Sequence, residues 1–205
     1  RVEGDIHRYT WANVAARSRQ VANAVDRMSL AQSDRVATLA WNGYRHLELY
    51  FGVSGSGRVL HTINPRLHPD QIAWIANHAE DQVLCFDMSF LPIVQAIHAK
   101  CSTVKHWIAL CDSDKLPTDT GIPNLQSYES WIAQEPTTYT WPELDENLAS
   151  SMCYTSGTTG NPKAALYSHR STILHAFAAA LPDVMAISAR DSILPVVPMF
   201  HVNAW

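Results

Sequence analysis

Positive charge and long apolar runs are both scarce in this sequence of 205 residues. Lys and Arg number 15 against 19 Asp and Glu, a formal net charge of -4 with no basic run, which disfavours contact with a nucleic-acid backbone or an anionic membrane surface. No apolar stretch reaches the roughly 18 residues that a transmembrane helix needs, and the start, Arg1-Val2-Glu3-Gly4-Asp5, lacks the basic and then apolar order of a signal peptide. We expect a cytoplasmic protein with no nucleic-acid partner and no transmembrane segment.

Metal-binding and disulfide patterns are missing as well. The four cysteines lie far apart, with neither the close pairs of a zinc knuckle nor the density of a disulfide-rich protein: Cys85, Cys101, Cys111 and Cys153. The histidines form no H-x-x-x-H or H-E-x-x-H set. We therefore expect reduced, mostly buried thiols and no transition-metal site built from protein ligands.

The sequence does contain a large apolar share, 47%, arranged in alternating patterns. Apolar residues at three- and four-residue steps, with Thr10 as an N-cap and Pro69-Asp70 as a helix start, predict helices at 11–28, 44–54, 69–79, 91–99, 128–133 and 168–180. Short β-branched runs predict strands at 35–41, 59–63, 82–86 and 104–110, and polar segments predict surface connections at 112–124 and 136–147. This alternation indicates an α/β fold, with a doubly wound, mainly parallel sheet and flanking helices.

One segment has the composition of a phosphate cradle: Tyr154-Thr-Ser-Gly-Thr-Thr-Gly-Asn-Pro-Lys163. Its two glycines allow a sharp turn and a close approach to a ligand. Its Ser and Thr hydroxyls and its backbone N–H groups can bind an oxyanion. Lys163 adds a positive charge that can face a polyanion such as a nucleotide triphosphate.

Glycine-rich segments have other interpretations too. Only Asn161 and Pro162 separate Gly160 from Lys163, and no Ser or Thr follows, so the spacing is not that of a Walker A loop and a P-loop NTPase is not the first choice. By composition alone, an ordinary flexible loop stays open. A second segment, Gly52-Val-Ser-Gly-Ser-Gly57, fits neither a dinucleotide nor an esterase motif, and we expect it to pack a helix closely on a strand.

The string from Tyr154 to Lys163 resembles the phosphate-binding signature of the adenylate-forming (AMP-binding) superfamily. Segments 34–42, 44–46, 59–67, 71–72 and 77–81 resemble the N-terminal domain of medium- and long-chain fatty acyl-CoA synthetases. The resemblance covers nearly the whole chain. It implies that residues 1–205 are a partial N-terminal AMP-binding domain, without the C-terminal half of that domain and without the small C-terminal domain.

The resemblance also implies a reaction. Such ligases join a fatty acid to ATP, with Mg²⁺, to give an acyl-adenylate and pyrophosphate, and coenzyme A then displaces AMP to form the thioester. By position, the residues that would bind the β- and γ-phosphates are Thr155, Ser156, Gly157, Thr158, Thr159, Gly160 and Lys163, with the Thr155 hydroxyl also on Mg²⁺. A homodimer is reasonable by the same resemblance. One departure is Ala164, where the family usually has glycine, and a methyl group there would crowd the loop if φ is positive.

The closing segment 197–205 is similar to the next motif of the family. The resemblance places His201 near the acyl-adenylate as a catalytic and substrate-binding residue, and Trp205 at the entrance of the fatty-acid tunnel. Without the resemblance, a histidine between Phe200 and Val202 is more often a core residue.

Two other functions stay open. One is a non-catalytic module that binds a phosphate-bearing ligand or only folds. The other is an adenylating enzyme with another substrate, an aryl-CoA synthetase or a domain that loads a carrier protein. In every case we expect residues 1–205 alone to be inactive, because half a site cannot bind adenine or close over the reacting atoms.

Overall fold

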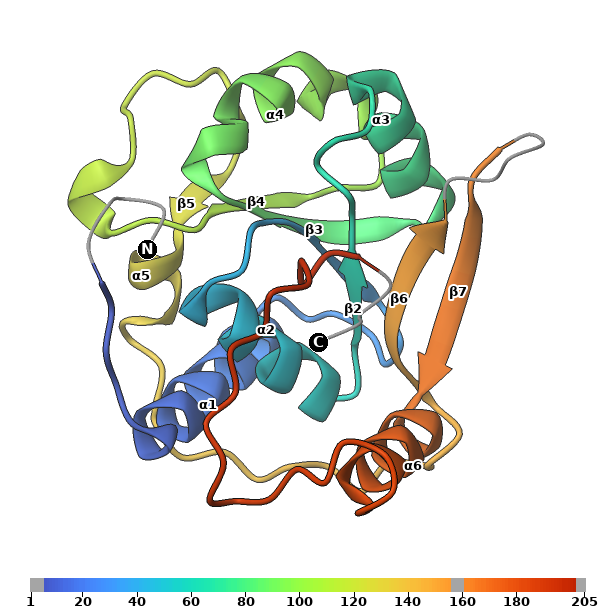
Figure 1. Ribbon diagram of the computed structural model, residues 1–205. Helices are drawn as coiled ribbons and strands as arrows, with labels where there is room; N and C mark the ends of the chain where they lie inside the picture. Colours follow the sequence, from blue (N-terminus) through green and yellow to red (C-terminus); the bar gives the residue numbers. More distant parts are fainter. Residues whose placement is uncertain (1–5, 156–160, 202–205) are drawn as a thin grey trace.

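The computed structural model describes residues 6–155 and 161–201, and these form a seven-stranded sheet with helices on both faces (Figure 1). The strands are β1 (Arg35–Leu39), β2 (Val59–Thr62), β3 (Asp81–Phe86), β4 (His106–Ala109), β5 (Leu125–Ser127), β6 (Ala149–Thr155) and β7 (Lys163–Ser168). Their order across the sheet is β5-β4-β3-β1-β2-β6-β7. Every neighbouring pair is parallel except β6 and β7. The predicted α/β fold with a mainly parallel sheet is confirmed.

The helices are α1 (Trp11–Arg27), α2 (Tyr44–Gly55), α3 (Pro69–His78), α4 (Leu91–Ile97), α5 (Tyr128–Ile132) and α6 (His169–Ala180). Single turns of 3₁₀ helix occur at Met88–Phe90, His98–Lys100 and Ser113–Lys115. The predicted cap of α1 is confirmed, since the Thr10 hydroxyl accepts from the backbone N–H of Asn13, whose side chain accepts in return from the Thr10 N–H. Helix α3 begins at Pro69, as predicted.

Three strands were not predicted from the sequence: β5, β6 and β7. Strand β6 has four buried residues, but two of them are Ser150 and Ser151, so its sequence lacks a strand-length apolar run. Strand β5 has three residues, and its middle residue, Gln126, is exposed, so it lacks an apolar pattern. Strand β7 is the other edge of the sheet, pairs antiparallel with β6, and has no fully buried residue, so the usual burial pattern of a strand is absent. The sheet is therefore mixed, with one antiparallel edge strand.

The core lies in two layers on either side of the sheet (Figure 1). Helices α1, α2 and α5 cover one face and α3 and α4 cover the other. Successive strand residues alternate between the layers: Val36 and Ile108 pack with the first set of helices, and Ala37 and Trp107 with the second. All four cysteines are buried free thiols. Within the two described ranges, no helix is both long enough and apolar enough to cross a bilayer.

The glycine-rich segment at 52–57 packs against another partner than predicted. A Cβ atom on Gly52 would lie 2.5 Å from Cγ1 of Val21 and 2.8 Å from the Ser18 carbonyl oxygen, both in α1. The expectation that these glycines bring a helix close to a strand is wrong. Gly52 lies against a second helix, and a Cβ atom on Gly55 would lie 2.7 Å from the ring of Trp141, which is in a connection. Gly57 serves the turn after α2, with a φ of +82°.

A buried ionic cluster joins α1, α2 and α5. Glu48, whose side chain is fully buried, accepts from Arg17 Nε at 2.7 Å and from the Tyr128 hydroxyl at 2.7 Å. Arg17 also binds both carboxylate oxygens of Glu129, at 3.0 and 3.1 Å, and Arg45 binds Glu129 at 2.9 Å. Burial raises the pKa of Glu48, and its bonds to Arg17 and Tyr128 oppose that effect. The cluster thus depends on opposite charges that are out of water together.

Acid should destabilise this fold through His46 in α2. Its Nδ1 lies 3.1 Å from the Trp41 carbonyl oxygen and its Nε2 lies 3.0 Å from the Thr38 hydroxyl, and burial lowers its pKa from 6.5 to about 4. Because the folded pKa is depressed, the folded state gains stability above pH 6.5 and loses it as the pH falls toward 4. We expect a loss of about 3 kcal/mol in the free energy of unfolding over that range, measured by urea titration. His46→Gln should remove this part of the pH dependence, and an unchanged slope would contradict the assignment.

Candidate active site

The predicted phosphate segment begins at the carboxyl edge of the sheet. Strands β1 to β6 are parallel, so all of them end at this edge, where ligands of open α/β sheets bind. Thr155 is the last residue of β6 and Lys163 the first of β7, and the two are cross-strand partners. The Thr155 hydroxyl donates to the Lys163 carbonyl oxygen at 3.3 Å. The two ends of the segment are therefore the two sides of one hairpin, while Ser156, Gly157, Thr158, Thr159 and Gly160 lie outside the described residues.

Lys163 is exposed at the start of β7. Its ammonium group has no carboxylate partner within the described ranges, whereas Lys100 and Lys115 pair with Asp70 and Asp114. A cation in this state is available to an anionic ligand. The concern about Ala164 is wrong, because Ala164 lies within strand β7 opposite Tyr154 and is not among the residues with positive φ. Its methyl group is compatible with that extended backbone.

The crevice between β1 and β3, where the strand order reverses, is filled by the protein's own side chains. The Trp41 backbone N–H donates to the Asp87 carboxylate at 2.6 Å, and its indole N–H donates to the Ser89 hydroxyl at 3.0 Å. The Trp41 and Phe90 ring centroids are 5.0 Å apart. Such a crevice is the usual ligand position in doubly wound sheets. Here the exposed groups that could bind a phosphate, such as Thr155 and Lys163, lie instead near the end of β6, and Arg66 lies after the end of β2.

The segment before His201 is attached to this same edge. Asn42, just after β1, accepts from the Met199 N–H at 2.7 Å and donates to the Val197 carbonyl oxygen at 3.0 Å. The Tyr50 hydroxyl donates to the Met199 carbonyl oxygen at 2.7 Å. Met199 and Phe200 are buried, and His201 is exposed. His201 is therefore not buried by any of the residues that the structure describes.

The end of β2 supplies the other contacts to this segment. The Thr62 hydroxyl donates to the Phe200 carbonyl oxygen at 3.4 Å, and the Arg66 guanidinium lies 5.7 Å from the centroid of the Phe200 ring. Both residues belong to sequence strings that resemble fatty acyl-CoA synthetases, but a string does not reveal what its residues touch. Trp205, the predicted tunnel residue, lies outside the described residues.

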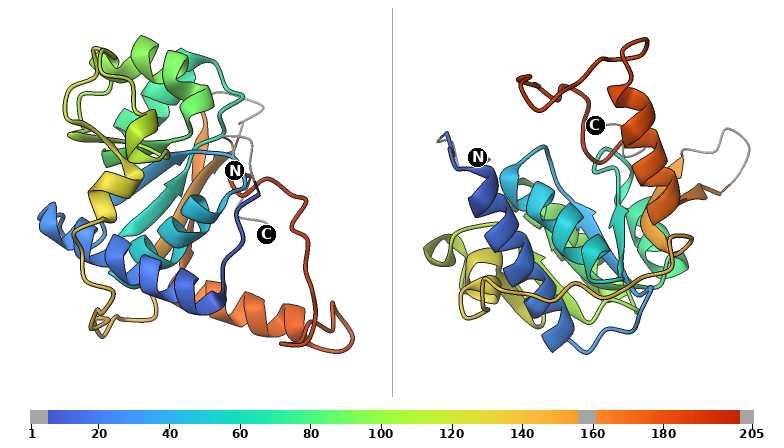
Figure 2. Two further views of the ribbon diagram at one scale, coloured as in Figure 1. Left: turned by 90° about the vertical axis from the view of Figure 1, so that its left-hand side faces the viewer. Right: turned by 90° about the horizontal axis from the view of Figure 1, so that it is seen from below.

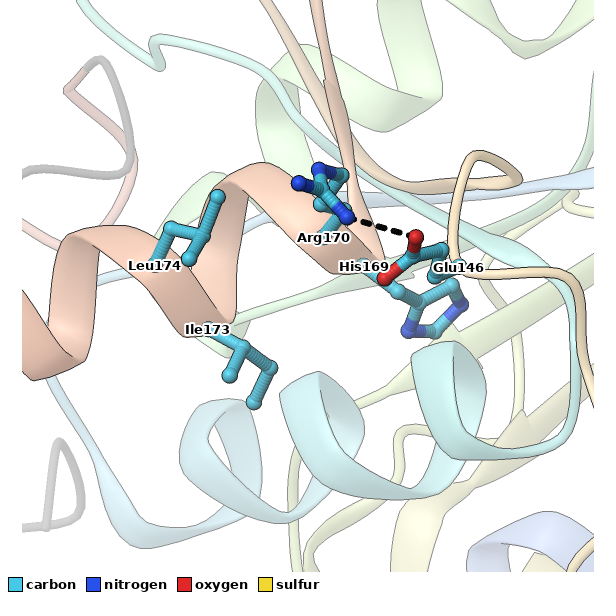
Figure 3. A pocket seen from close by; sticks show the side chains of 5 residues that line it. All are labelled: Glu146, His169, Arg170, Ile173 and Leu174. Carbon is cyan, nitrogen blue, oxygen red and sulfur yellow. Dashed lines mark hydrogen bonds and ion pairs between the residues drawn. The ribbon is translucent and has the colours of Figure 1, made fainter.

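A hollow of about 170 Å³ lies elsewhere, at the start of α6 (Figure 3). It is lined by Glu146, His169, Arg170, Ile173 and Leu174, and Arg170 pairs with Glu146 at 2.6 Å across it. This hollow is below the usual size of a ligand site. It lies at the Ser168 end of β7, opposite the end that carries Lys163, so it is separate from the candidate active site.

The described residues are suited to bind Mg²⁺ only together with the phosphates of a substrate. In residues 6–155 and 161–201 there is no group of three or more His, Cys, Asp or Glu that could hold a metal ion. In nucleotide-dependent enzymes, Mg²⁺ is held by few protein oxygens together with substrate phosphates. The exposed Thr155 hydroxyl at the end of β6 is one oxygen of this kind.

The whole chain matches a known family. The sequence model of the family described as AMP-binding enzyme covers residues 2–205. The chain belongs to this family. The geometry agrees with that assignment, since the signature segment begins at the end of β6, at the carboxyl edge of the sheet.

Individual members of the AMP-binding enzyme family agree in sequence and in fold. The medium-chain-fatty-acid–CoA ligase of Ectopseudomonas oleovorans is 53% identical over 202 residues, which are 98% of this chain and 37% of that protein. The 3-methylmercaptopropionyl-CoA ligase of Ruegeria pomeroyi is 51% identical over 99% of this chain and 38% of its own length. The Mycobacterium tuberculosis fatty acyl CoA synthetase superposes with a TM-score of 0.79 at 25% identity, over 99% of this chain and 37% of that one. This chain thus spans less than two fifths of the length of these relatives.

Proposed function

We propose that the full-length protein is an AMP-forming acyl-CoA synthetase that activates a fatty acid. A carboxylate oxygen of the acid attacks the α-phosphorus of ATP and pyrophosphate leaves, which gives an acyl-adenylate. The thiol of coenzyme A then attacks the acyl carbon, and AMP leaves as the thioester forms. The observation that carries this proposal is the Thr155–Lys163 hairpin end at the carboxyl edge of the sheet. Its hydroxyl is exposed, and its ammonium has no carboxylate partner among residues 6–155 and 161–201.

The first step needs positive charge and hydrogen-bond donors around the departing pyrophosphate. Lys163 supplies the charge, and we assign the same phosphates to the backbone and hydroxyl groups of Ser156, Gly157, Thr158, Thr159 and Gly160. Bound Mg²⁺ would neutralise phosphate charge, with the Thr155 hydroxyl among its ligands. The protein needs no general base for this step, because a carboxylate is already ionised at neutral pH.

His201 and Trp205 are assigned to the acyl side of the site. The bonds from Asn42 and Tyr50 hold the segment before His201 against the end of β1 and the outer side of α2. His201 is exposed at the edge where the sheet strands end, which is compatible with contact to the carboxylate being activated. We propose that Trp205 borders the entrance for the acyl chain.

The apolar surface around α6 supports the proposal that residues 1–205 are only part of an AMP-binding domain. Helix α6 has no buried residue, and its Ile173, Leu174 and Phe177 are 55%, 53% and 69% exposed. The chain beyond it, drawn in red in Figure 2, runs along the outside and exposes Leu194 by 83% and Val196 by 80%. An apolar surface of this extent is a contact surface. We propose that the remaining part of the longer polypeptide covers it, and that residues 1–205 alone do not turn over.

The relatives leave the acid itself open, since a medium-chain fatty acid and a methylmercapto-propionate are named at nearly equal identity. We propose a medium- or long-chain fatty acid, a cytoplasmic enzyme that draws on ATP and coenzyme A, and a homodimer. The test is formation of acyl-CoA by the protein at its natural length, with fatty acids of increasing chain length, an aryl acid and 3-methylmercaptopropionate as competitors.

A highest kcat/KM with a fatty acid supports the proposal. Preference for an aryl acid, or transfer of the acyl group only to a carrier protein, would contradict the proposed substrate class but would support the proposed adenylation reaction. Binding of ATP without any acid-dependent product would make the protein a phosphate-ligand-binding module and would contradict the proposal.

A further inference from the structure

The Tyr154 ring is enclosed by residues from two other elements. The Tyr154 hydroxyl and Nδ1 of His78, at the end of α3, share a hydrogen bond of 2.6 Å. The Trp74 ring meets the Tyr154 ring edge-on at 6.4 Å and stacks on His78 at 4.6 Å. On the sheet side, the ring of His61 in β2 lies 5.3 Å from Tyr154. Tyr154 therefore has a hydrogen bond at its hydroxyl and ring contacts with Trp74 and His61.

His61 is itself held in place. Its Nδ1 lies 2.9 Å from both oxygens of the Asp81 carboxylate at the start of β3, and both side chains are fully buried. The single N–H on Nδ1 is shared between the two carboxylate oxygens, which restrains the plane of the imidazole. The ring that Tyr154 contacts on the sheet side is therefore held in place. Burial raises the pKa of Asp81, and the contact with His61 opposes that rise.

Tyr154 occupies a decisive position in the chain. It directly precedes Thr155, and its cross-strand partner is Ala164, which directly follows Lys163. Thr155 and Lys163 form the next and last pair of the β6–β7 ladder. A fixed Tyr154 therefore fixes the direction from which the Thr155 hydroxyl and the Lys163 ammonium leave the sheet. Both groups must be held to within a fraction of an ångström to act on phosphates.

From this arrangement we infer that Tyr154 and His78 are positioning residues for the phosphate site. Their hydrogen bond ties the end of β6 to the end of α3 and so sets Thr155 and Lys163 for the β- and γ-phosphates. This inference rests on the proposed function. A phenylalanine would fill the same space as Tyr154, so the hydroxyl and its exposed histidine partner serve orientation rather than packing.

The test is a double-mutant cycle in the protein at its natural length, read by ATP–pyrophosphate exchange. Tyr154→Phe and His78→Leu should each raise KM for ATP by about 3- to 10-fold, which is the effect of one lost hydrogen bond. KM for the acid should stay within about 2-fold, since the acyl side does not use this bond. The double variant should be no worse than either single variant, because both remove one interaction.

Two controls separate positioning from a general loss of structure. His78→Asn keeps a polar atom near the place of Nδ1 and should restore KM for ATP to within about 2-fold of the wild type. Tyr139→Phe removes another tyrosine hydroxyl bond, to Asp26 at 2.9 Å on α1, and should leave KM for ATP unchanged. Effects that add in the double variant, or a KM for ATP that neither single variant changes, would overturn the inference.

Failure of the proposed function would be visible separately, as absence of exchange in the wild type. In that case amide hydrogen exchange at Thr155 and Lys163 decides about positioning. Faster exchange at both amides in Tyr154→Phe and in His78→Leu, with no change in Tyr139→Phe, supports it. Exchange equal to that of the wild type overturns it.

Discussion

Replacing Lys163 with alanine is expected to lower kcat/KM for ATP–pyrophosphate exchange by about 10²- to 10³-fold, the usual cost of removing one group that stabilises transition-state charge. Lys163 is exposed at the first position of β7, opposite Thr155, and has no carboxylate partner in the part of the chain that the structure describes. Negative charge grows on the leaving pyrophosphate, so the loss should appear in kcat as well as in KM for ATP. Lys163→Arg keeps the charge and should recover part of the activity.

The matched control for Lys163 is Lys105→Ala. Lys105 is an exposed lysine just before β4, at the amino edge of the sheet. Lys105→Ala therefore changes the net charge by the same amount as Lys163→Ala, but at the opposite end of the strands. Exchange should change less than about 2-fold, because a charge at that distance is screened by salt. Equal losses in the two variants would mean that the effect of Lys163 is not local, and would contradict its assignment to the phosphates.

Replacing Arg17 with methionine is expected to lower the free energy of unfolding by about 3–5 kcal/mol at pH 7, the usual cost of leaving a buried charge unpaired. Arg17 is the cation that contacts the fully buried Glu48, at 2.7 Å, and the bond from the Tyr128 hydroxyl alone cannot neutralise that carboxylate. Urea titration of the wild type and the variant measures the difference.

A second substitution tests the reason for this loss. Arg17→Met combined with Glu48→Gln removes both charges and should recover at least half of the lost stability, because a neutral amide still accepts from Tyr128. The single variant should also lose less stability at pH 5 than at pH 7, since burial raises the pKa of Glu48 and a proton can then replace the missing cation. If the double variant is less stable than Arg17→Met, the damage comes from lost packing rather than from unpaired charge.

Most elements could be predicted from the sequence because their burial is periodic. In α1, residues Val14, Val21 and Val25 recur on one face and are all buried. Four of the five residues of β1 are buried, and three of these four are apolar, as expected for a strand with helices on both sides. Edge strands lack that signal. Strand β5 has three residues with one buried, and β7 has none fully buried, so neither differs from a connection in its sequence pattern.

The site shows the same division. The segment from Tyr154 to Lys163 could be assigned by its order of residues, and the structure adds that its two ends pair as β6 and β7. Contacts between distant segments had no such signal. The bonds of His78 to Tyr154 and of Asn42 to Met199 join residues 76 and 157 positions apart. Such pairs become visible only when helices and strands are placed in three dimensions.

We propose that this hairpin end belongs to an enzyme that adenylates a fatty acid. The most direct measurement is exchange of labelled pyrophosphate into ATP by the protein at its natural length, with its intact mass determined on the same sample. We expect exchange that requires both Mg²⁺ and a fatty acid and that is lost in Lys163→Ala. Exchange without an acid, release of ADP and orthophosphate in its place, or no exchange by a protein of full length would contradict it.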